Sequence, residues 1–468
     1  MPLRRIRAPE IDFSAVRAEL DLPAQFPDDV VAEALRAAAS PVPPRRDATD
    51  IELVTVDPPG SRDLDQAVHI AVSGGGYLVT YAIADVAVFA PIDGPLGRES
   101  RRRGETMYSP DTRTPLYPPE LSEGAASLLP GQVRPALLWQ IDLDRSGRPT
   151  TVDVRRALVR SRAQLDYPGL QAHVEAGTAP AAVRLLPEVG RLRQQLARDR
   201  AAINLNLPEQ EVVRDAAGSW SLELRVPLPV EGYNAEISLL TGMCAARLML
   251  DGGVGLLRTL PPADGPTVAG LREVARALSI DWPEGATPGD VACAVDPGTP
   301  AGEAFLSSAA SLLRGAGYTA FDGSLPAQPG HAGVGAPYAH VTAPLRRLAD
   351  RFAGEVCLAR CAGTEIPSDV RHMLPELPEL MSGADHRAHE LERAVVDLTE
   401  ATVLAGRVGE TFGAVVVESG PRRNLVTLAD LPVRAVCNGT GLSLGQRLTV
   451  RLIQADPATR AVRFAVAD

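Results

Sequence analysis

The hydrophobic pattern of the chain changes its period several times, and the order of these changes limits the folds that it can adopt. Residues 1–45 contain short helical patterns, and a strand-like pattern begins at residue 51. Helical spacing dominates from residue 167 to about residue 405, and short strand-like runs fill the remainder. With 468 residues, the chain is also too long for one compact core. An α+β protein with more than one domain is therefore expected.

The first 404 residues predict helices, then strands, then helices again. Two short helices are expected near residues 13–20 and 28–39. Strand-like runs cover residues 51–56, 67–72, 77–89 and 135–162. Helical spacing covers residues 167–196, 233–250, 303–316, 342–362 and 384–405. This order favours a mixed sheet whose covering helices follow its strands in the chain.

The last part of the chain has the pattern of a small β-barrel. Five short strand-like runs, separated by Gly, Pro and Asp-Pro turns, cover residues 409–419, 424–430, 432–437, 446–456 and 461–468. Such spacing suggests a closed barrel, of which the OB-fold is the commonest form that binds nucleic acid. A barrel that only caps the main domain stays open as an alternative. The reason is that these strands offer just Phe412 and Phe464 for base stacking.

Three aspartates stand within nine positions on a turn rich in Pro and Gly. Asp57, Asp63 and Asp65 lie between two strand-like runs, so the turn joins the end of one strand to the start of the next. Mutual repulsion makes such a cluster costly unless a cation lies among the carboxylates. Strand ends are rigid, as a metal site requires of its ligands. The plainer alternative is a set of solvated acids on a loop.

Charge and composition narrow the classes of function. The net charge is −11, which argues against a protein that coats nucleic acid non-specifically, but not against a strand threaded through a locally basic channel. All 47 basic residues are arginine, whose planar fork suits phosphate. No apolar run is long enough to span a membrane, and the N-terminus lacks the apolar segment of a secretory signal. Five scattered cysteines favour a reducing cytoplasm without disulfides. A cytoplasmic protein with no membrane partner is expected.

Six motifs follow one another along the chain in a fixed order. They are TVDPPGSRDLDQAV, YAIADVAVF, RGETMYSPDTRTPLYPPELSEGAASLLPG, INLNLPE, YNAEISLL and YAHVTAPLRRLAD. Together they resemble the RNase II / RNase R (RNB) family of 3′-5′ exoribonucleases, over roughly residues 27 to 468. The resemblance implies an RNB-type catalytic domain at 46–404 and an OB-fold RNA-binding domain at 405–468. A small helical module, for which a helix-turn-helix is one interpretation, is expected at 1–45.

The resemblance also implies roles for individual residues. Asp57, Asp63 and Asp65 match the acids of the family's metal cluster, and Arg346 matches its catalytic arginine. The implied cofactor is Mg²⁺, as one or two ions, with Mn²⁺ able to substitute. Residues implied to contact the substrate, or to support Arg346, are Tyr108, Tyr167, Glu236, His340 and Arg347. Without the resemblance, these side chains would be interpreted as strand, helix and core residues.

The sequence departs from the family pattern at several positions. Leu205 and Leu348 stand where the family often has aromatic residues, and one further departure falls in the metal cluster. The fourth acid of the metal cluster falls on Gln66, which is neutral and a poorer ligand for Mg²⁺. We predict a monomeric, Mg²⁺-dependent hydrolytic 3′-5′ exoribonuclease that degrades single-stranded RNA to nucleoside 5′-monophosphates. A catalytically weakened RNA-binding protein on the same scaffold is the first alternative, because of Gln66. A metal phosphodiesterase that acts on small molecules is the second.

Overall fold

One curved sheet carries the central part of the chain. The structure is a computed structural model, and it describes residues 5–40, 42–43, 45–203, 205, 209–214, 218–420 and 423–467. The sheet has the strand order β2 (Arg46–Asp47), β9 (Pro149–Asp166), β3 (Leu53–Asp57), β4 (Gln66–Ser73), β5 (Gly76–Ala84) and β8 (Val133–Leu143). The long β9 pairs with β8 along its first part and with β3 along its last part. The sheet therefore curls back on itself. The strands predicted in this region are confirmed, except that the run expected over 77–89 ends as a strand at Ala84 and continues as a 3₁₀ turn over Val86–Val88.

The register of β3 sets the position of the turn that carries Asp57, Asp63 and Asp65, called the carboxylate turn below. Residues 53–56 are all buried, as expected for a strand covered on both faces. The parallel pairing of β3 with β9 places Asp57 opposite Asp166, the last residue of β9. Helix α4 (Tyr167–Glu175) starts at the next residue, and the Asp166 carboxylate caps it by accepting from the Gly169 N–H at 2.7 Å. The end of β3 and the start of α4 therefore lie side by side.

Helices pack against the sheet and share one large hydrophobic core with it. They include α5 (Leu186–Asp199), α6 (Pro229–Gly252), α10 (Leu348–Ala362) and α11 (Ser368–Met373). Ile237 and Leu240 of α6, Phe352 of α10 and Trp139 of β8 are fully buried in this core. The helix expected over 342–362 begins only at residue 348, so that prediction was wrong for its first six positions. Pro344 interrupts this stretch, and the Asp350 carboxylate accepts from the Ala343 N–H at 2.7 Å instead.

The N-terminal region contains a strand as well as the two predicted helices. Helices α1 (Ser14–Glu19) and α2 (Asp28–Ala39) pack into different hydrophobic clusters. Strand β1 (Arg5–Ala8), which the sequence pattern did not predict, pairs with β11 (Trp220–Arg225), and β11 pairs with β10 (Glu209–Arg214). The two helices predicted for residues 1–45 are confirmed, and β1 is added to them. The domain boundaries stay a prediction.

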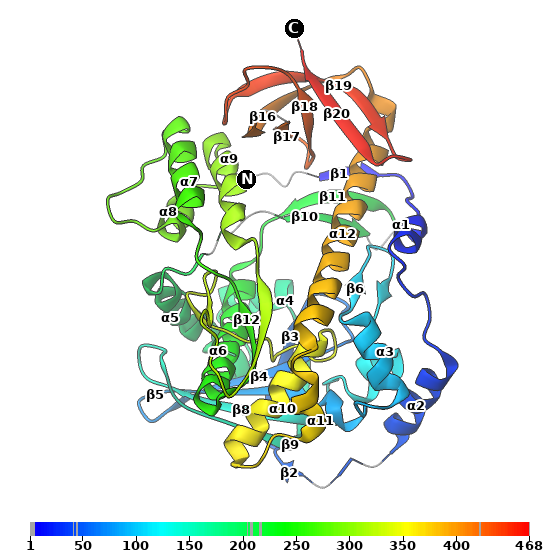
Figure 1. Cartoon of the computed structure of the whole chain (residues 1–468), viewed down its shortest axis with the longest axis vertical. Helices are drawn as coiled ribbons and strands as arrows, with labels where there is room; N and C mark the ends of the chain where they lie inside the picture. The colour runs from blue at the N-terminus through cyan, green and yellow to red at the C-terminus, as the bar shows by residue number, and fades with distance from the viewer. Residues whose placement is uncertain are drawn as a thin grey trace.

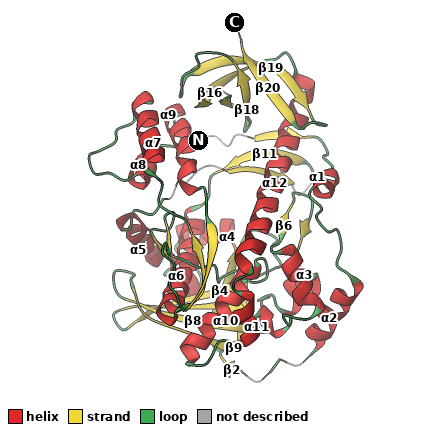
Figure 2. Cartoon of the chain, viewed as in Figure 1, coloured by secondary structure: helices red, strands yellow, loops and turns green. Residues whose placement is uncertain are grey.

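Five strands form the predicted closed barrel at the C-terminal end. They are β16 (Thr411–Ser419), β17 (Asn424–Leu428), β18 (Arg434–Asn438), β19 (Arg447–Asp456) and β20 (Ala461–Val466). Phe412 and Phe464 pack edge to face with centroids 5.9 Å apart, so each ring is engaged by the other. The long helix α12 (Leu377–Leu404) leads from the sheet up to the barrel (Figure 1). Figure 2 shows the barrel strands as a separate layer above the six-stranded sheet and the helices that pack against it.

A helical segment lies beside the barrel. It comprises α7 (Gly265–Ala277), α8 (Pro288–Ala294) and α9 (Pro300–Ala309), and it follows β12 (Val254–Thr259), which pairs with β13 (Gly317–Asp322). The helix expected over 303–316 is shorter, because residues 310–313 continue as a 3₁₀ turn. Phe305 is buried beneath Trp282 in a cluster that also includes Val417 of the barrel. In the part of the chain that the structure describes, no helix is both long and apolar enough to span a bilayer.

Candidate functional site

Six of the nine residues predicted from the family motifs line a single pocket. The pocket has a volume of about 460 Å³, and it receives Asp57, Asp63, Asp65, Tyr108, Tyr167 and Arg346. Four separate parts of the chain supply them. They are the carboxylate turn, the hairpin of β6 (Met107–Tyr108) and β7 (Arg113–Thr114), the start of α4 and the segment before α10. Gln66, Arg113 and residues 58–61 complete the lining.

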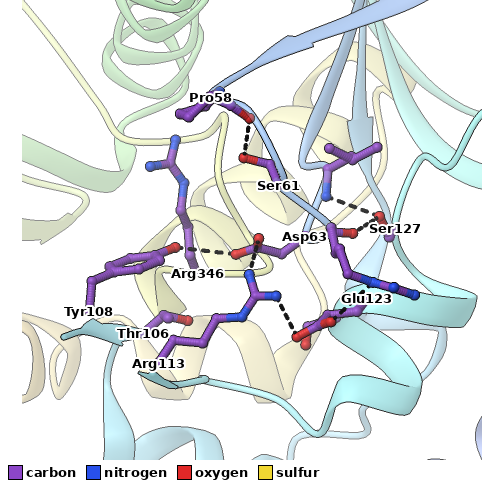
Figure 3. A network of polar contacts seen from close by, with 12 residues as sticks. Pro58, Ser61, Asp63, Thr106, Tyr108, Arg113, Glu123, Ser127 and Arg346 are labelled. Atoms are coloured by element: carbon purple, nitrogen blue, oxygen red, sulfur yellow. Dashed lines mark hydrogen bonds and ion pairs between the residues drawn. The ribbon is translucent and has the colours of Figure 1, made fainter. Parts of the chain in front are cut away.

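The carboxylate turn is held in place by local hydrogen bonds. Gly60 has a φ of +81°, which permits the tight reversal after the two prolines, and the Ser61 N–H donates to the Pro58 carbonyl at 3.2 Å. The buried Ser127 hydroxyl donates to the Arg62 carbonyl at 2.6 Å and accepts from the Leu64 N–H at 3.0 Å (Figure 3). Ser127 therefore fixes the backbone on both sides of Asp63.

Asp65 and Arg346 form the central ion pair of the pocket, although 281 positions separate them. The Asp65 carboxylate accepts from the Leu345 N–H at 2.7 Å and from Arg346 Nε at 3.2 Å. Asp65 is only 2% exposed, and this burial raises its pKa to about 8 despite the nearby guanidinium. The Arg346 side chain is 45% exposed, so its tip is available to a ligand in the pocket.

Asp63 is held by groups of the β6–β7 hairpin. Its carboxylate accepts from Arg113 Nη1 at 2.8 Å and from the Tyr108 hydroxyl at 3.2 Å (Figure 3). Tyr108 and Arg113 are cross-strand partners, so the hairpin register presents both to the same carboxylate. Arg113 also reaches Glu123 at 2.8 Å. Nothing in the sequence pattern singles out Arg113 or Glu123, because this contact depends on the hairpin register.

Asp57 has the least satisfied carboxylate of the three. Within the described residues, its Oδ2 is buried and has no hydrogen-bond partner. Burial is the largest cause that raises its pKa, to about 6. Beside it, the Tyr167 hydroxyl accepts from Asn234 Nδ2 at 3.4 Å, and the same amide reaches the Val56 carbonyl. Asn234 is a third residue that sequence reasoning missed, because the motif resemblance assigned a role on this helix to Glu236 instead.

Gln66 has a structural role that an ionised acid could not fill. Its Nε2 donates to the carbonyl of Thr342, in the segment that leads to Arg346. A carboxylate at this position would face the carbonyl oxygen without a proton to share. Gln66 therefore connects the carboxylate turn to the loop of the catalytic arginine predicted by the resemblance.

The donor set of the pocket fits a hard divalent cation, because it offers carboxylate oxygens and one of them is an orphan on Asp57. Among the described residues, no three His, Cys, Asp or Glu side chains already lie close enough together to hold an ion. Guanidinium groups explain this spacing, since Arg113 holds Asp63 and Arg346 holds Asp65. The metal assignment of the three aspartates stays a prediction.

Three of the predicted residues do not line the pocket. Glu236 lies near Arg193 and Arg200, which partly offset the rise in its pKa caused by burial. The His340 Nδ1 pairs with the Tyr318 hydroxyl at 2.7 Å, and burial lowers its pKa well below the usual range. His340 thus has a protein partner outside the pocket, whereas the buried Oε2 of Glu236 has no hydrogen-bond partner among the described residues. The substrate roles of both side chains stay predictions.

Arg347 is turned away from the pocket in a similar manner. Its Nε and Nη2 donate to the Asp350 carboxylate, each at 3.0 Å. The backbone on either side of Arg347 is tied to the stretch that precedes β6. The Thr106 N–H donates to the Arg346 carbonyl at 2.9 Å, and the Leu348 N–H donates to the Gly104 carbonyl at 3.0 Å. This arrangement places Arg347 where it can support the Arg346 loop, which was one of its two predicted roles. Its contact with phosphate stays a prediction.

Comparison with known proteins agrees with this architecture. A family profile described as "RNB domain" matches residues 45–354, and one described as "RNase II-type exonuclease C-terminal S1 domain" matches residues 410–467. Ribonuclease R of Aquifex aeolicus is 27% identical over 426 residues, which cover 86% of this chain and 59% of the relative. The chain spans between two fifths and three fifths of the length of such curated relatives.

Solved structures share the fold at low sequence identity. Mycoplasma genitalium RNase R in complex with ribose-methylated single-stranded RNA has a TM-score of 0.85 and 18% identity, covering 97% of this chain and 77% of that chain. Yeast Ssd1, described as a pseudonuclease, has a TM-score of 0.71 and 18% identity, covering 88% of this chain and 53% of that chain. The predicted fold class, a mixed α+β domain with a C-terminal five-stranded barrel, is thereby confirmed.

Proposed function

The chain belongs to the family of RNB-domain proteins, and from that premise we propose that it is a Mg²⁺-dependent 3′-5′ exoribonuclease. It would hydrolyse single-stranded RNA from the 3′ end and release nucleoside 5′-monophosphates. The observation that carries the proposal is the Asp65–Arg346 pair, joined at 3.2 Å inside a pocket that also receives Asp57 and Asp63. We expect the protein to act as a monomer in the cytoplasm.

The residues of the pocket divide the work of hydrolysis among them. Asp57, Asp63 and Asp65 would hold Mg²⁺, for which Mn²⁺ is expected to substitute. A bound divalent ion polarises the phosphate and makes a water molecule easier to deprotonate. Asp65 fixes Arg346 through Nε. The exposed Nη groups of that arginine are thereby free to donate to the non-bridging phosphate oxygens as charge builds up on them.

Aromatic residues of the pocket account for the grip on RNA. The Tyr108 ring is 52% exposed, so one face is available to stack on a base. The Tyr167 hydroxyl, positioned by Asn234, can hydrogen-bond to a ribose 2′-hydroxyl, the group that distinguishes RNA from DNA. The C-terminal barrel, to which an S1-domain profile matches, would hold the strand upstream of the pocket.

The direct test uses one RNA labelled at either end and incubated with the purified protein and Mg²⁺. We expect the 3′ label to appear at once as a mononucleotide and the 5′-labelled strand to shorten stepwise. Asp65→Asn should abolish both. Asp322→Asn, which removes an exposed carboxylate that pairs with Arg371, is the matched control and should behave as the wild type. Absence of mononucleotide release, or full activity of Asp65→Asn, would contradict the proposal.

A second candidate is an RNA-binding protein that has lost turnover. Two observations favour it, namely Gln66 in place of the fourth acid and the fold shared with a pseudonuclease. This candidate predicts that the wild type and Asp65→Asn bind RNA equally and that neither releases nucleotides. Measuring RNA affinity by fluorescence anisotropy beside the release assay separates the two candidates.

A further inference from the structure

The pocket contains a second guanidinium group besides that of Arg346. Arg113 lines the pocket from the β6–β7 hairpin and donates to Asp63 at 2.8 Å. Its other terminal nitrogen lies 2.8 Å from Glu123. Arg113 is therefore clamped between two carboxylates (Figure 3). The Arg113 side chain is 28% exposed, so it is neither loose on the surface nor closed off from the pocket.

The charges of the lining show what Arg113 does to the site. With all three carboxylates ionised, they face two guanidinium groups, and the lining carries one formal negative charge. Outside the lining, Glu123 is balanced by Arg62, whose Nε lies 3.3 Å from it. Gln66 adds no charge. One bound divalent ion would change the net formal charge of the pocket from −1 to +1. A second ion would raise it to +3 within a volume of about 460 Å³.

The two positive groups also divide the carboxylates unequally. Arg113 and Tyr108 engage both oxygens of Asp63, whereas the Oδ2 of Asp57 has no partner among the described residues. Both oxygens of Asp65 accept hydrogen bonds, from the Leu345 N–H and from Arg346. Asp57 is therefore the carboxylate at which a cation finds an unpaired oxygen. Asp63 lies on the side that already has a fixed cation. Arg113 is thus hydrogen-bonded to Asp63, a residue that the motif resemblance implies to be a metal ligand.

We propose that Arg113 takes the place of a second divalent ion, so that the pocket binds a single ion, at the unpaired oxygen of Asp57. This inference rests on the proposed function, because it concerns the metal that the proposed hydrolysis uses. The guanidinium neutralises Asp63, donates from a fixed position and cannot dissociate. The neutral Gln66 and the cationic Arg113 then form one adaptation. A site that has lost its fourth acid no longer needs the ion that this acid would have balanced.

The test counts bound ions with Mn²⁺ alone and does not depend on RNA cleavage. Free Mn²⁺ is measured by its electron paramagnetic resonance signal as metal is titrated into the protein. We expect one tight Mn²⁺ per wild-type chain and two per chain for Arg113→Met and Arg113→Gln. Arg113→Lys, which keeps the charge, should stay at one. Arg371→Met, which removes an exposed arginine that is not part of the pocket lining, should also stay at one.

The outcomes separate this inference from the proposed function. Two ions on the wild type, or one ion on both neutral Arg113 variants, would overturn the role of Arg113. No ion on the wild type would overturn it as well, together with the metal part of the proposed function. A change from one ion to two without any nucleotide release would uphold the role of Arg113 and overturn the nuclease. Thermal unfolding midpoints show which variants are folded, and Arg113→Gln can still donate to Asp63 if Arg113→Met cannot fold.

Discussion

Asp65 and Glu400 are both almost completely buried, and burial raises the pKa of each to about 8, yet their surroundings differ. Glu400 lies on α12 where that helix meets the barrel, and it accepts from the Arg434 N–H at 2.9 Å and from Gln210 Nε2 at 2.8 Å. Asp65 shares an open pocket with two other carboxylates and the exposed end of Arg346. A raised pKa thus marks burial in both regions. Only the convergence of charged groups around open space marks a candidate site.

The strongest test of this comparison replaces a carboxylate by an amide in each region. Asp57→Asn removes the unpaired oxygen of the pocket, and we expect nucleotide release to fall by more than about 100-fold, because a direct ligand matters more than its supporting residues. Glu400→Gln keeps an oxygen that can accept both of its hydrogen bonds and should leave the rate within about twofold. Single-turnover assays with labelled RNA provide the measurement. Equal rates for the two variants would remove the distinction between the regions.

Arg346 and Arg434 provide the second test, since each is an arginine beside a buried carboxylate. Arg346→Lys keeps the charge but loses the planar fork, so we expect a fall in single-turnover rate of about 100-fold. The Arg434 side chain donates to Ser307 on α9, and Arg434→Lys leaves the backbone N–H that serves Glu400 unchanged. That control should retain nearly the full rate. A wild-type rate for Arg346→Lys would show that its guanidinium does not contact the reacting phosphate.

The sequence allowed most of the fold to be predicted, because the strands and barrel depend on local spacing. β3, β4, β5 and the five barrel strands were each expected from alternating or continuous apolar runs. β1 was not, because its four residues RIRA show no diagnostic pattern and its partner β11 begins more than 200 positions later. Pairing at such a separation is a property of the whole chain, and local periodicity does not encode it.

The site was predicted only as far as motif resemblance reached. The resemblance brought Asp57, Asp65 and Arg346 together, and all three line one pocket. No spacing rule connects Asp65 with Arg346, which are 281 positions apart. Asn234 and Glu236 show where this approach fails. Two positions apart on a helix, they cannot face the same direction, so Asn234 reaches Tyr167 while Glu236 lies by Arg193. Arg113 had no local signal at all.

A third prediction concerns aromatic rings in the two regions. Tyr108→Ala should weaken the binding of single-stranded RNA by about tenfold, since stacking on one base contributes roughly 1–3 kcal/mol. Tyr108→Phe, which keeps the ring and loses only the hydrogen bond to Asp63, should bind nearly as the wild type. Affinity is measured by anisotropy in EDTA, so that no RNA is cleaved. The Phe412 and Phe464 rings of the barrel pack on each other and are not expected to stack on bases. Unchanged affinity of Tyr108→Ala would assign the stacking elsewhere.

The smallest expected effect is a pH dependence of stability at Glu400. Its pKa is raised to about 8 from an ordinary 4.5, so between these values the carboxyl is protonated in the folded chain and ionised in the unfolded one. Unfolding then releases a proton, and rising pH destabilises the fold across this window. Glu400→Gln removes the titration. Its midpoint of thermal unfolding should match the wild type at pH 5 and exceed it by about 2–4 °C at pH 8.5.

A matched control makes this last comparison decisive. Glu273→Gln changes an exposed glutamate that pairs with Arg276 on the same helix, and it should follow the wild type at both pH values. Scanning calorimetry of the wild type and of both variants, each at pH 5 and pH 8.5, measures how the unfolding midpoint of each protein changes with pH. If the curves of Glu400→Gln and the wild type stayed parallel, the carboxyl would be ionised in the folded chain, held by the Arg434 N–H and Gln210. The region where α12 meets the barrel would then tolerate a buried charge through hydrogen bonds alone. That result would mean that hydrogen-bond partners, rather than burial, decide the charge state of Glu400.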